Sequence, residues 1–265
     1  MDTSQFWIEE RDLTSDSGFL IFGLKHCVVL IIILLFLVSF TIWFCKTKFQ
    51  KKDIILKIIA VLLPLLEMLK IIMLLLCHRM DKGHLPLHLC SMAIFIYPLI
   101  TFTHNKKLRE SLSEISVITL MPAAVFALLF PDWTMYPIMN FYCIHAFLWH
   151  ALQVLLPILF IKYGWCRPCV RNIWKNSLFL LVGGSIIWVF DSIMSCNYWF
   201  LKEPAPVSPL EWLYNTFGNY VYVPALFVMA TLVNIISYGI CSLSSSVETA
   251  YIGRKRKRCY NKINP

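Results

Sequence analysis

Long blocks of apolar residues alternate with short polar stretches along the whole chain. The blocks are roughly 16–25 residues long, which is the length of helix that crosses a hydrocarbon core of about 30 Å. We expect membrane-spanning helices over residues 19–45, 54–77, 86–103, 115–130, 139–161, 177–196 and 217–241. The pattern therefore predicts an all-α fold, a polytopic transmembrane bundle of seven helices with no separate soluble domain.

Polar sequence is confined to the loops and the two chain ends. Residues 1–18 are polar and acidic, residues 19–241 hold the predicted bundle, and residues 242–265 form a basic tail. The first apolar block is too long for a signal peptide, and the segment before it lacks a basic start. We therefore expect three parts: an extracytoplasmic N-terminal segment, a transmembrane domain and a cytoplasmic tail.

The basic residues are unevenly distributed between the two sides of the predicted bundle. Of the 24 Lys and Arg residues, 18 lie in the tail or in and beside the loops after the first, third and fifth predicted helices. The positive-inside bias places these segments in the cytoplasm and the N-terminus outside. It also explains the net charge of +9 without nucleic acid. We predict a multi-pass protein of the cell membrane whose immediate partners are lipids; no protein partner is indicated.

The composition agrees with a membrane protein and indicates no cofactor. Hydrophobic residues make up 58% of the chain and charged residues 15%, against about 45–50% and about 25% in soluble domains. Most of the ten cysteines lie inside apolar blocks, where cysteine acts as a small hydrophobe. Cys166 and Cys169 form a lone CxxC, and structural zinc needs about four ligands. We expect neither a metal nor a cofactor.

Polar and ionisable residues recur in the outer halves of five predicted helices. Such groups are costly at membrane depth and usually face the bundle interior or a wet cavity, so we predict an outward-opening polar cavity. Glu67 and Lys70 are spaced i, i+3, and a structural ion pair explains them as well as a substrate site. Gly183 and Gly184 would allow a neighbouring helix to approach closely. The candidate substrate-binding residues are Glu67, Lys70, His84, Asp191, Asn197 and Tyr220.

Two histidines and a cysteine gather where a polar loop meets the third apolar block. Pro86 predicts a helix start, which places Cys90 about one turn inside, where the partial positive charge of the helix end lowers a thiol pKa. A lone cysteine in an apolar helix is more often a packing residue than a nucleophile, so both interpretations stay open. In a regular helix His88 points about 200° away from Cys90. His145, expected at similar depth, is therefore the easier base.

The chain resembles a known family over nearly its whole length, and two short segments and a histidine carry the resemblance. Residues 85–90 (LPLHLC), a histidine early in the fifth predicted helix, and residues 197–201 (NYWFL) followed by Pro204 resemble the YwaF-like bacterial integral membrane protein family. That family is similar to distant eukaryotic membrane proteins that act as phospholipid acyltransferases through a cysteine that carries the acyl group. The resemblance implies that Cys90 is the acyl carrier and that a phospholipid is the substrate. In those relatives the cysteine and histidine are adjacent, whereas Leu89 separates them here.

Three functions from different classes remain open. In a membrane acyltransferase or thioesterase-like enzyme acting on lipid, Cys90 would be the nucleophile and His145 the base. His88 or Asn197 would orient the head group or the oxyanion. In a transporter or binding protein for a polar solute, Glu67, Lys70 and Asp191 would hold the solute or relay protons with the histidines. The third function is a helper subunit whose cavity is structural. No inverted repeat is visible, which counts against a transporter.

Overall fold

A computed structural model describes residues 5–13 and 17–263 of the chain, with side chains described through residue 243. All regular elements in these residues are helical, and six helices are long and apolar enough to cross a membrane. They are α1 (Leu24–Lys46), α2 (Phe49–Leu76), the continuous α4–η5–α5 helix (Lys106–Leu129), α6 (Phe141–Tyr163), α7 (Ile173–Met194) and α8 (Pro209–Ile263). The seventh, η4–α3 (Cys90–Phe102), is apolar but shorter. The predicted all-α class and the seven helices are confirmed for the described chain.

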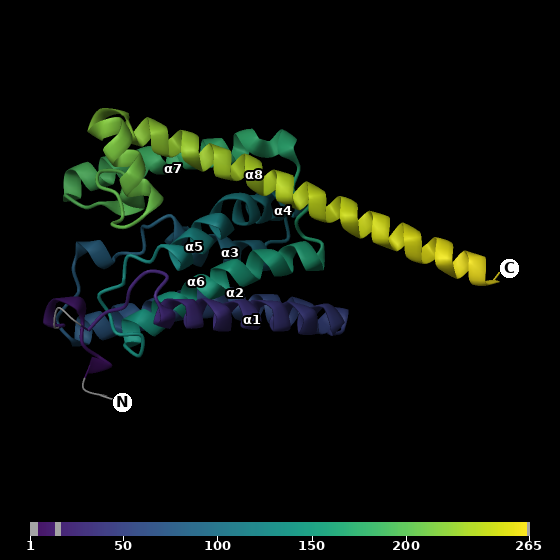
Figure 1. Cartoon of the computed structure of the whole chain (residues 1–265), viewed down its shortest axis with the longest axis horizontal. Coiled ribbons are helices and arrows are strands. Elements are labelled where there is room, and N and C mark those ends of the chain that lie inside the picture. Colours follow the sequence, from purple (N-terminus) through teal and green to yellow (C-terminus); the bar gives the residue numbers. More distant parts are fainter. Residues whose placement is uncertain (1–4, 14–16, 264–265) are drawn as a thin grey trace.

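The helices form two groups with the short helices between them. Figure 1 shows α1, α2 and α6 along one edge of the bundle and α7 with α8 along the other, with α3, α4 and α5 between them. The central helix is α6, which packs against α1, α2 and α5. Its buried residues include Leu155, Leu159 and Phe160. The rigid core therefore lies around α6, and most of α1 is exposed at the edge.

The chain enters the bundle at one end and leaves it along α8 at the other (Figure 1). We call the end that carries the loops at residues 47–48, 103–105 and 164–169 the basic end. The opposite end, with the loops at residues 77–89, 130–140 and 195–208, we call the Cys90 end. The odd number of helices in the described chain, seven, explains this separation. The side of the membrane that each end faces stays a prediction, and residues 1–4, 14–16 and the side chains of the basic tail lie outside the described part of the chain.

The basic stretch before the fourth apolar block was expected to be a loop, and that expectation is wrong. Lys106–Ile115 forms α4, because the Asn105 side chain caps it by accepting a hydrogen bond from the Leu108 N–H at 3.1 Å. The helix buries Ser113 and Glu114 on one side and exposes its charged residues on the other. It continues through a π-helical turn into α5, so a polar helix extends the apolar one.

The last helix also differs from the prediction. α8 begins at Pro209 rather than at residue 217, and its backbone breaks at Gly218, where φ is 72° and ψ is 170°. Glycine has no Cβ and tolerates this positive φ, which would strain other residues. The segment before Gly218 is thus a separate helical piece at the Cys90 end.

Gly183, but not Gly184, allows a close approach, and the partner is a ring and not another helix. A Cβ on Gly183 would lie 2.7 Å from Cη2 of Trp199, in the short helix η7 (Tyr198–Phe200), whereas one on Gly184 would be 3.9 Å from that ring. The ring cannot move freely, because its Nε1–H donates to the Leu87 carbonyl at 2.9 Å. Gly183 therefore makes room for the Trp199 ring, which joins α7 to the segment before Cys90.

We expect Gly183→Ala to destabilise the protein by about 1–3 kcal/mol, because the methyl group overpacks the held ring. Gly184→Ala is the matched control and should change stability by about 0.5 kcal/mol or less. Thermal unfolding of both variants in detergent measures the difference. Equal midpoints for the two variants would contradict the packing of Trp199 on Gly183.

Candidate functional site

The Cys90 segment enters its helix irregularly. Residues 85–89 are not helical, and the helix begins at Cys90 itself with the 3-10 turn η4 (Cys90–Met92). Cys90 thus lies in the first turn and not one turn inside, which corrects the prediction. The Ser91 N–H donates to the His88 carbonyl at 2.9 Å, and this turn sets the local geometry. The 200° separation of His88 and Cys90 in a regular helix therefore does not apply here.

The surroundings of the Cys90 thiol are apolar. Cys90 is half-buried and packs against the core that includes Leu63, Tyr97 and Trp149. Apolar packing favours a protonated thiol, and the Asp132 carboxylate lies close enough to act on Cys90 electrostatically. The expected activation of the thiol by the helix end alone is therefore opposed by its environment. A thiolate at Cys90 would need a neighbouring group that accepts the proton.

His145, on α6, has one ring nitrogen held and one available. Its Nε2 lies 3.1 Å from the Leu66 carbonyl of α2, and because a carbonyl only accepts, Nε2 carries the proton. No described residue bonds to Nδ1, which then holds the lone pair. His26 shows the structural contrast, since its Nδ1 accepts from the Phe22 N–H at 3.0 Å while its Nε2 bonds to the Leu128 carbonyl at 2.9 Å. His145 therefore has a nitrogen for proton transfer, and His26 does not.

His150, five residues further along α6, is also oriented by a hydrogen bond to a backbone carbonyl. Its Nδ1 lies 2.8 Å from the Ala146 carbonyl and therefore donates, which leaves Nε2 as the basic nitrogen. The ring stacks on Trp133 with centroids 5.0 Å apart. Trp133 belongs to the loop between α5 and α6, so this stacking fixes that loop over the histidine.

The side chain of Lys70 on α2 connects the histidines electrostatically. Its ammonium is 2.6 Å from the Glu67 carboxylate, and Glu67 is only 3% exposed. The positive charge of Lys70 acts on four histidines that come from two separate parts of the chain, His84, His88, His145 and His150. These four histidines with Glu67 and Lys70 form the group that we call the histidine cluster. That these side chains line one outward-opening cavity stays a prediction.

The two loop histidines of the cluster are neutral at physiological pH. Burial, with a smaller effect of Lys70, lowers the pKa of His84, although Asp81 opposes the shift. Burial also lowers the pKa of His88 to about 4, and Lys70 and His150 add to the effect. The His88 ring lies edge-on to Tyr198 at 4.7 Å. His88 can thus offer a neutral imidazole to a bound group.

Sequence reasoning gave no role to Asp132, which lies in the loop between α5 and α6. Burial raises the pKa of its carboxyl, and its charge reaches Cys90. The signal was present, because Asp132 is the only carboxylate in the short loop between two apolar blocks.

The other three predicted binding residues lie in different surroundings. Asp191 is buried at the end of α7, and its backbone carbonyl accepts a hydrogen bond from Lys202 Nζ at 2.5 Å. The Asn197 side chain holds its own loop, with Oδ1 accepting from the Lys202 N–H at 3.0 Å and Nδ2 donating to the Glu203 carbonyl at 2.8 Å. Tyr220 is 97% exposed. Among the described residues, none of the three bonds to the histidine cluster.

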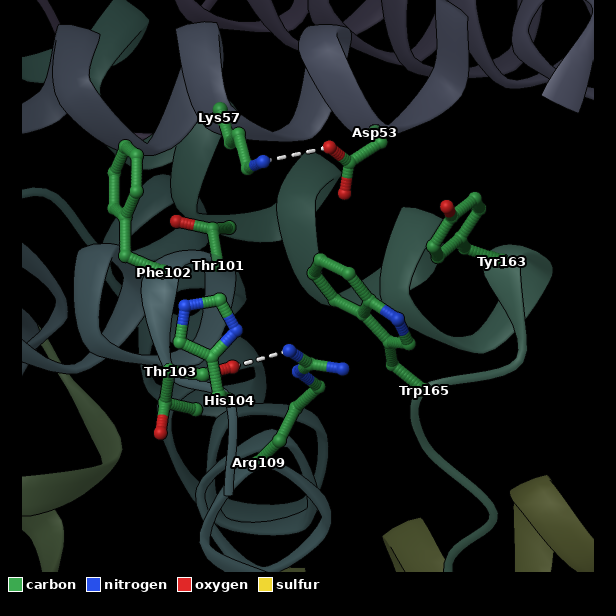
Figure 2. Close-up of a pocket in the computed structure, with 9 residues that line it drawn as sticks. All are labelled: Asp53, Lys57, Thr101, Phe102, Thr103, His104, Arg109, Tyr163 and Trp165. Carbon is green, nitrogen blue, oxygen red and sulfur yellow. Dashed lines mark hydrogen bonds and ion pairs between the residues drawn. The ribbon is translucent and has the colours of Figure 1, made fainter. Parts of the chain in front are cut away.

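A separate polar cavity lies at the basic end, between α2, α3, α4 and α6. Its volume is about 420 Å³ (Figure 2). On one side of the cavity the Lys57 ammonium pairs with the Asp53 carboxylate at 2.7 Å (Figure 2). On the other side the Arg109 guanidinium donates a hydrogen bond to the Thr103 carbonyl and lies 4.7 Å from the centroid of the Trp165 ring (Figure 2). The sequence had assigned these basic residues to membrane topology alone. Within the described residues, no group of three or more His, Cys, Asp or Glu side chains could hold a metal ion.

These features define a multi-pass integral membrane protein that gathers polar side chains at both ends of an apolar bundle. Comparison with protein families makes the class specific: residues 21–238 match the TMEM164 family, and the chain belongs to that family. No curated protein and no solved structure matches it. The family match covers both Cys90 and the histidine cluster.

Proposed function

We propose that this protein is an acyltransferase of the cell membrane that transfers a fatty acyl chain between phospholipids through a thioester at Cys90. The observation that carries the proposal is the placement of an apolar-packed thiol at the same end of the bundle as an imidazole, His145, whose Nδ1 is available. The resemblance to YwaF-like proteins, and through them to lipid acyltransferases, supports the same chemistry.

In the first half-reaction the Cys90 Sγ attacks the carbonyl carbon of an ester in the donor lipid. His145 Nδ1 accepts the thiol proton, so that the attacking species is a thiolate formed only in the step. The carbon–oxygen bond of the ester breaks, and the proton passes from His145 to the leaving glycerol oxygen. The products are a lysolipid and an acyl thioester on Cys90.

In the second half-reaction the hydroxyl of an acceptor lysolipid attacks the thioester carbon. His145 Nδ1 takes the hydroxyl proton, the carbon–sulfur bond breaks, and the proton returns to Sγ. The Lys70 ammonium and the neutral imidazoles of His84 and His88 supply charge and donors for a phosphate group. Glu67, Asp191, Asn197 and Tyr220 remain predicted substrate contacts, which variants at each position would test.

Detection of the acyl-enzyme tests the proposal. Purified protein is incubated with a phosphatidylcholine that carries an isotopically labelled acyl chain, and the intact mass is measured. We expect one adduct with the mass of that acyl group, released by hydroxylamine and located on Cys90 by peptide mapping. His145→Ala should form it about 10²–10⁴ times more slowly.

Two other results would count against the acyltransferase. Adducts spread over exposed cysteines such as Cys45 and Cys77 would indicate unspecific acylation. No adduct at all, with unchanged lipids, would favour the binding of a polar solute by the histidine cluster.

A further inference from the structure

A second cavity lies at the basic end, next to the first and far along the bundle from Cys90. Its volume is about 690 Å³, and Trp165 lines both cavities. The lining residues come from α4, the loop after α6 and the start of α7. They are Lys106, Lys107, Glu110, Ser111, Glu114, Gly164, Trp165, Arg167, Asn172 and Lys175. We call this space the Lys107 cavity.

The Lys107 cavity is strongly positive. Four of its lining residues are cationic and two are carboxylates, and both carboxylates already have partners among the described residues. Glu110 lies beside Lys106 at 3.9 Å, and Glu114 is turned inward, where it accepts hydrogen bonds from the Cys169 N–H and Asn172 Nδ2 at 2.8 and 2.7 Å. Among the described residues, no carboxylate pairs with the other three cations, Lys107, Arg167 and Lys175.

The start of α4 lies at this cavity and adds to its positive potential. Lys106 and Lys107 are the first two residues of α4, whereas α7 is preceded without a break by the 3-10 turn η6 (Val170–Asn172). Backbone N–H groups in the first turn of a helix have no intrahelical partner and favour an anion. Convergent lysine, arginine and helix-terminal donors are a combination that suits phosphate oxygens.

The apolar face of α7 starts directly beside the Lys107 cavity. Val170, Trp174 and Leu178 are spaced four residues apart and are 59%, 58% and 49% exposed. This spacing puts them on one face of the helix, which continues along the membrane-spanning length of α7. A lipid whose acyl chains lie along this face would bring its head group to the cavity mouth.

We propose that the Lys107 cavity binds a phosphate-bearing ligand, whose phosphate contacts Lys107, Arg167 and Lys175. The exposed α7 face favours the head group of a membrane lipid as the source of that phosphate over a free phosphate compound. Basic pockets between transmembrane helices on the cytoplasmic side of a membrane bind anionic lipid head groups. The cavity lies at the opposite end from Cys90, so the binding does not depend on the acyltransferase proposal.

Native mass spectrometry of the full chain in detergent tests the site with three probes. Dioleoyl phosphatidic acid offers a phosphate monoester with acyl chains, dioleoyl phosphatidylcholine offers a zwitterionic head group, and glycerol 3-phosphate offers the phosphate alone. The test variant combines Lys107→Gln, Arg167→Gln and Lys175→Gln. The control variant removes the same charge from the same end, with Lys46→Gln, Lys48→Gln and Lys51→Gln, which are exposed and line neither cavity.

We expect phosphatidic acid to bind more tightly than phosphatidylcholine, and the test variant to weaken its binding about tenfold or more while the control changes it little. Equal weakening in both variants, or none in either, would overturn the site. Glycerol 3-phosphate that binds as tightly, with the same dependence on the three residues, would keep the phosphate chemistry and overturn the lipid source. The three single variants are measured as well, so a folding defect in the triple variant leaves the test intact.

Discussion

Cys90→Ala is expected to abolish acyl transfer to a lysolipid acceptor while the protein still reaches the membrane and folds. The substitution removes the sulfur that would form the thioester, and no other described group can replace it at that position. Cys90 is only half-buried, so the loss of one sulfur atom should cost little stability. The activity is measured as the conversion of a labelled lysophosphatidylcholine to phosphatidylcholine by purified protein in mixed micelles.

Cys143→Ala is the matched control for that experiment. Cys143 is a buried thiol near the start of α6 that packs against Phe147 and Tyr142 rather than against the core beside Cys90. We expect this variant to retain transfer activity. Cys90→Ser adds a conservative variant, whose weaker nucleophile should lower the rate strongly without a change in folding. Full activity of Cys90→Ala would rule out the thioester route.

Glu114→Ala is expected to have the largest effect on stability, a loss of about 3–5 kcal/mol. The Glu114 carboxylate is 5% exposed and accepts hydrogen bonds from the Cys169 N–H, from Asn172 Nδ2 and, at 3.0 Å, from the Tyr238 hydroxyl. It therefore ties α4 to the loop before α7 and to α8. Removal of the acceptor leaves the buried Tyr238 hydroxyl and the half-buried Asn172 amide without this partner, and each loss costs about 1–3 kcal/mol.

Thermal and denaturant unfolding in detergent measure this loss, with Glu110→Ala as the control on the same helix. Glu110 is exposed and has only a weak pairing with Lys106 at 3.9 Å, so its loss should change stability by about 0.5 kcal/mol or less. Glu114→Gln keeps an acceptor oxygen and should fall between the two. If Glu114→Ala unfolds like Glu110→Ala, the carboxylate does not hold the helices together.

The sequence by itself determined the class of the fold. Apolar blocks of membrane-crossing length can only be helices, because the hydrocarbon core offers no water to the backbone groups. The prediction failed where polar residues determine at which residue a helix begins. α4 was taken for a loop because Lys106, Lys107 and Arg109 resemble a basic turn, whereas the Asn105 cap and the inward Glu114 make that stretch helical.

The depth of each residue along its predicted helix indicated only in part which side chains come together at the Cys90 end. Depth placed His88 and His145 in the outer part of the predicted bundle and Lys70 at its mid-depth. It could not tell which histidine keeps a free nitrogen, because that depends on backbone carbonyls brought from other helices, such as Leu66 beside His145 and Leu128 beside His26.

Tertiary structure alone decided the remaining features. The Asp132 charge acts on Cys90, and Trp133 stacks on His150, because the loop between α5 and α6 packs against the helices. The Lys107 cavity exists because the start of α4, the start of α7 and the loop between α6 and α7 lie side by side. Spacing along one helix encodes only the contacts of that helix, while the packing of separate helices creates cavities and leaves charges without partners.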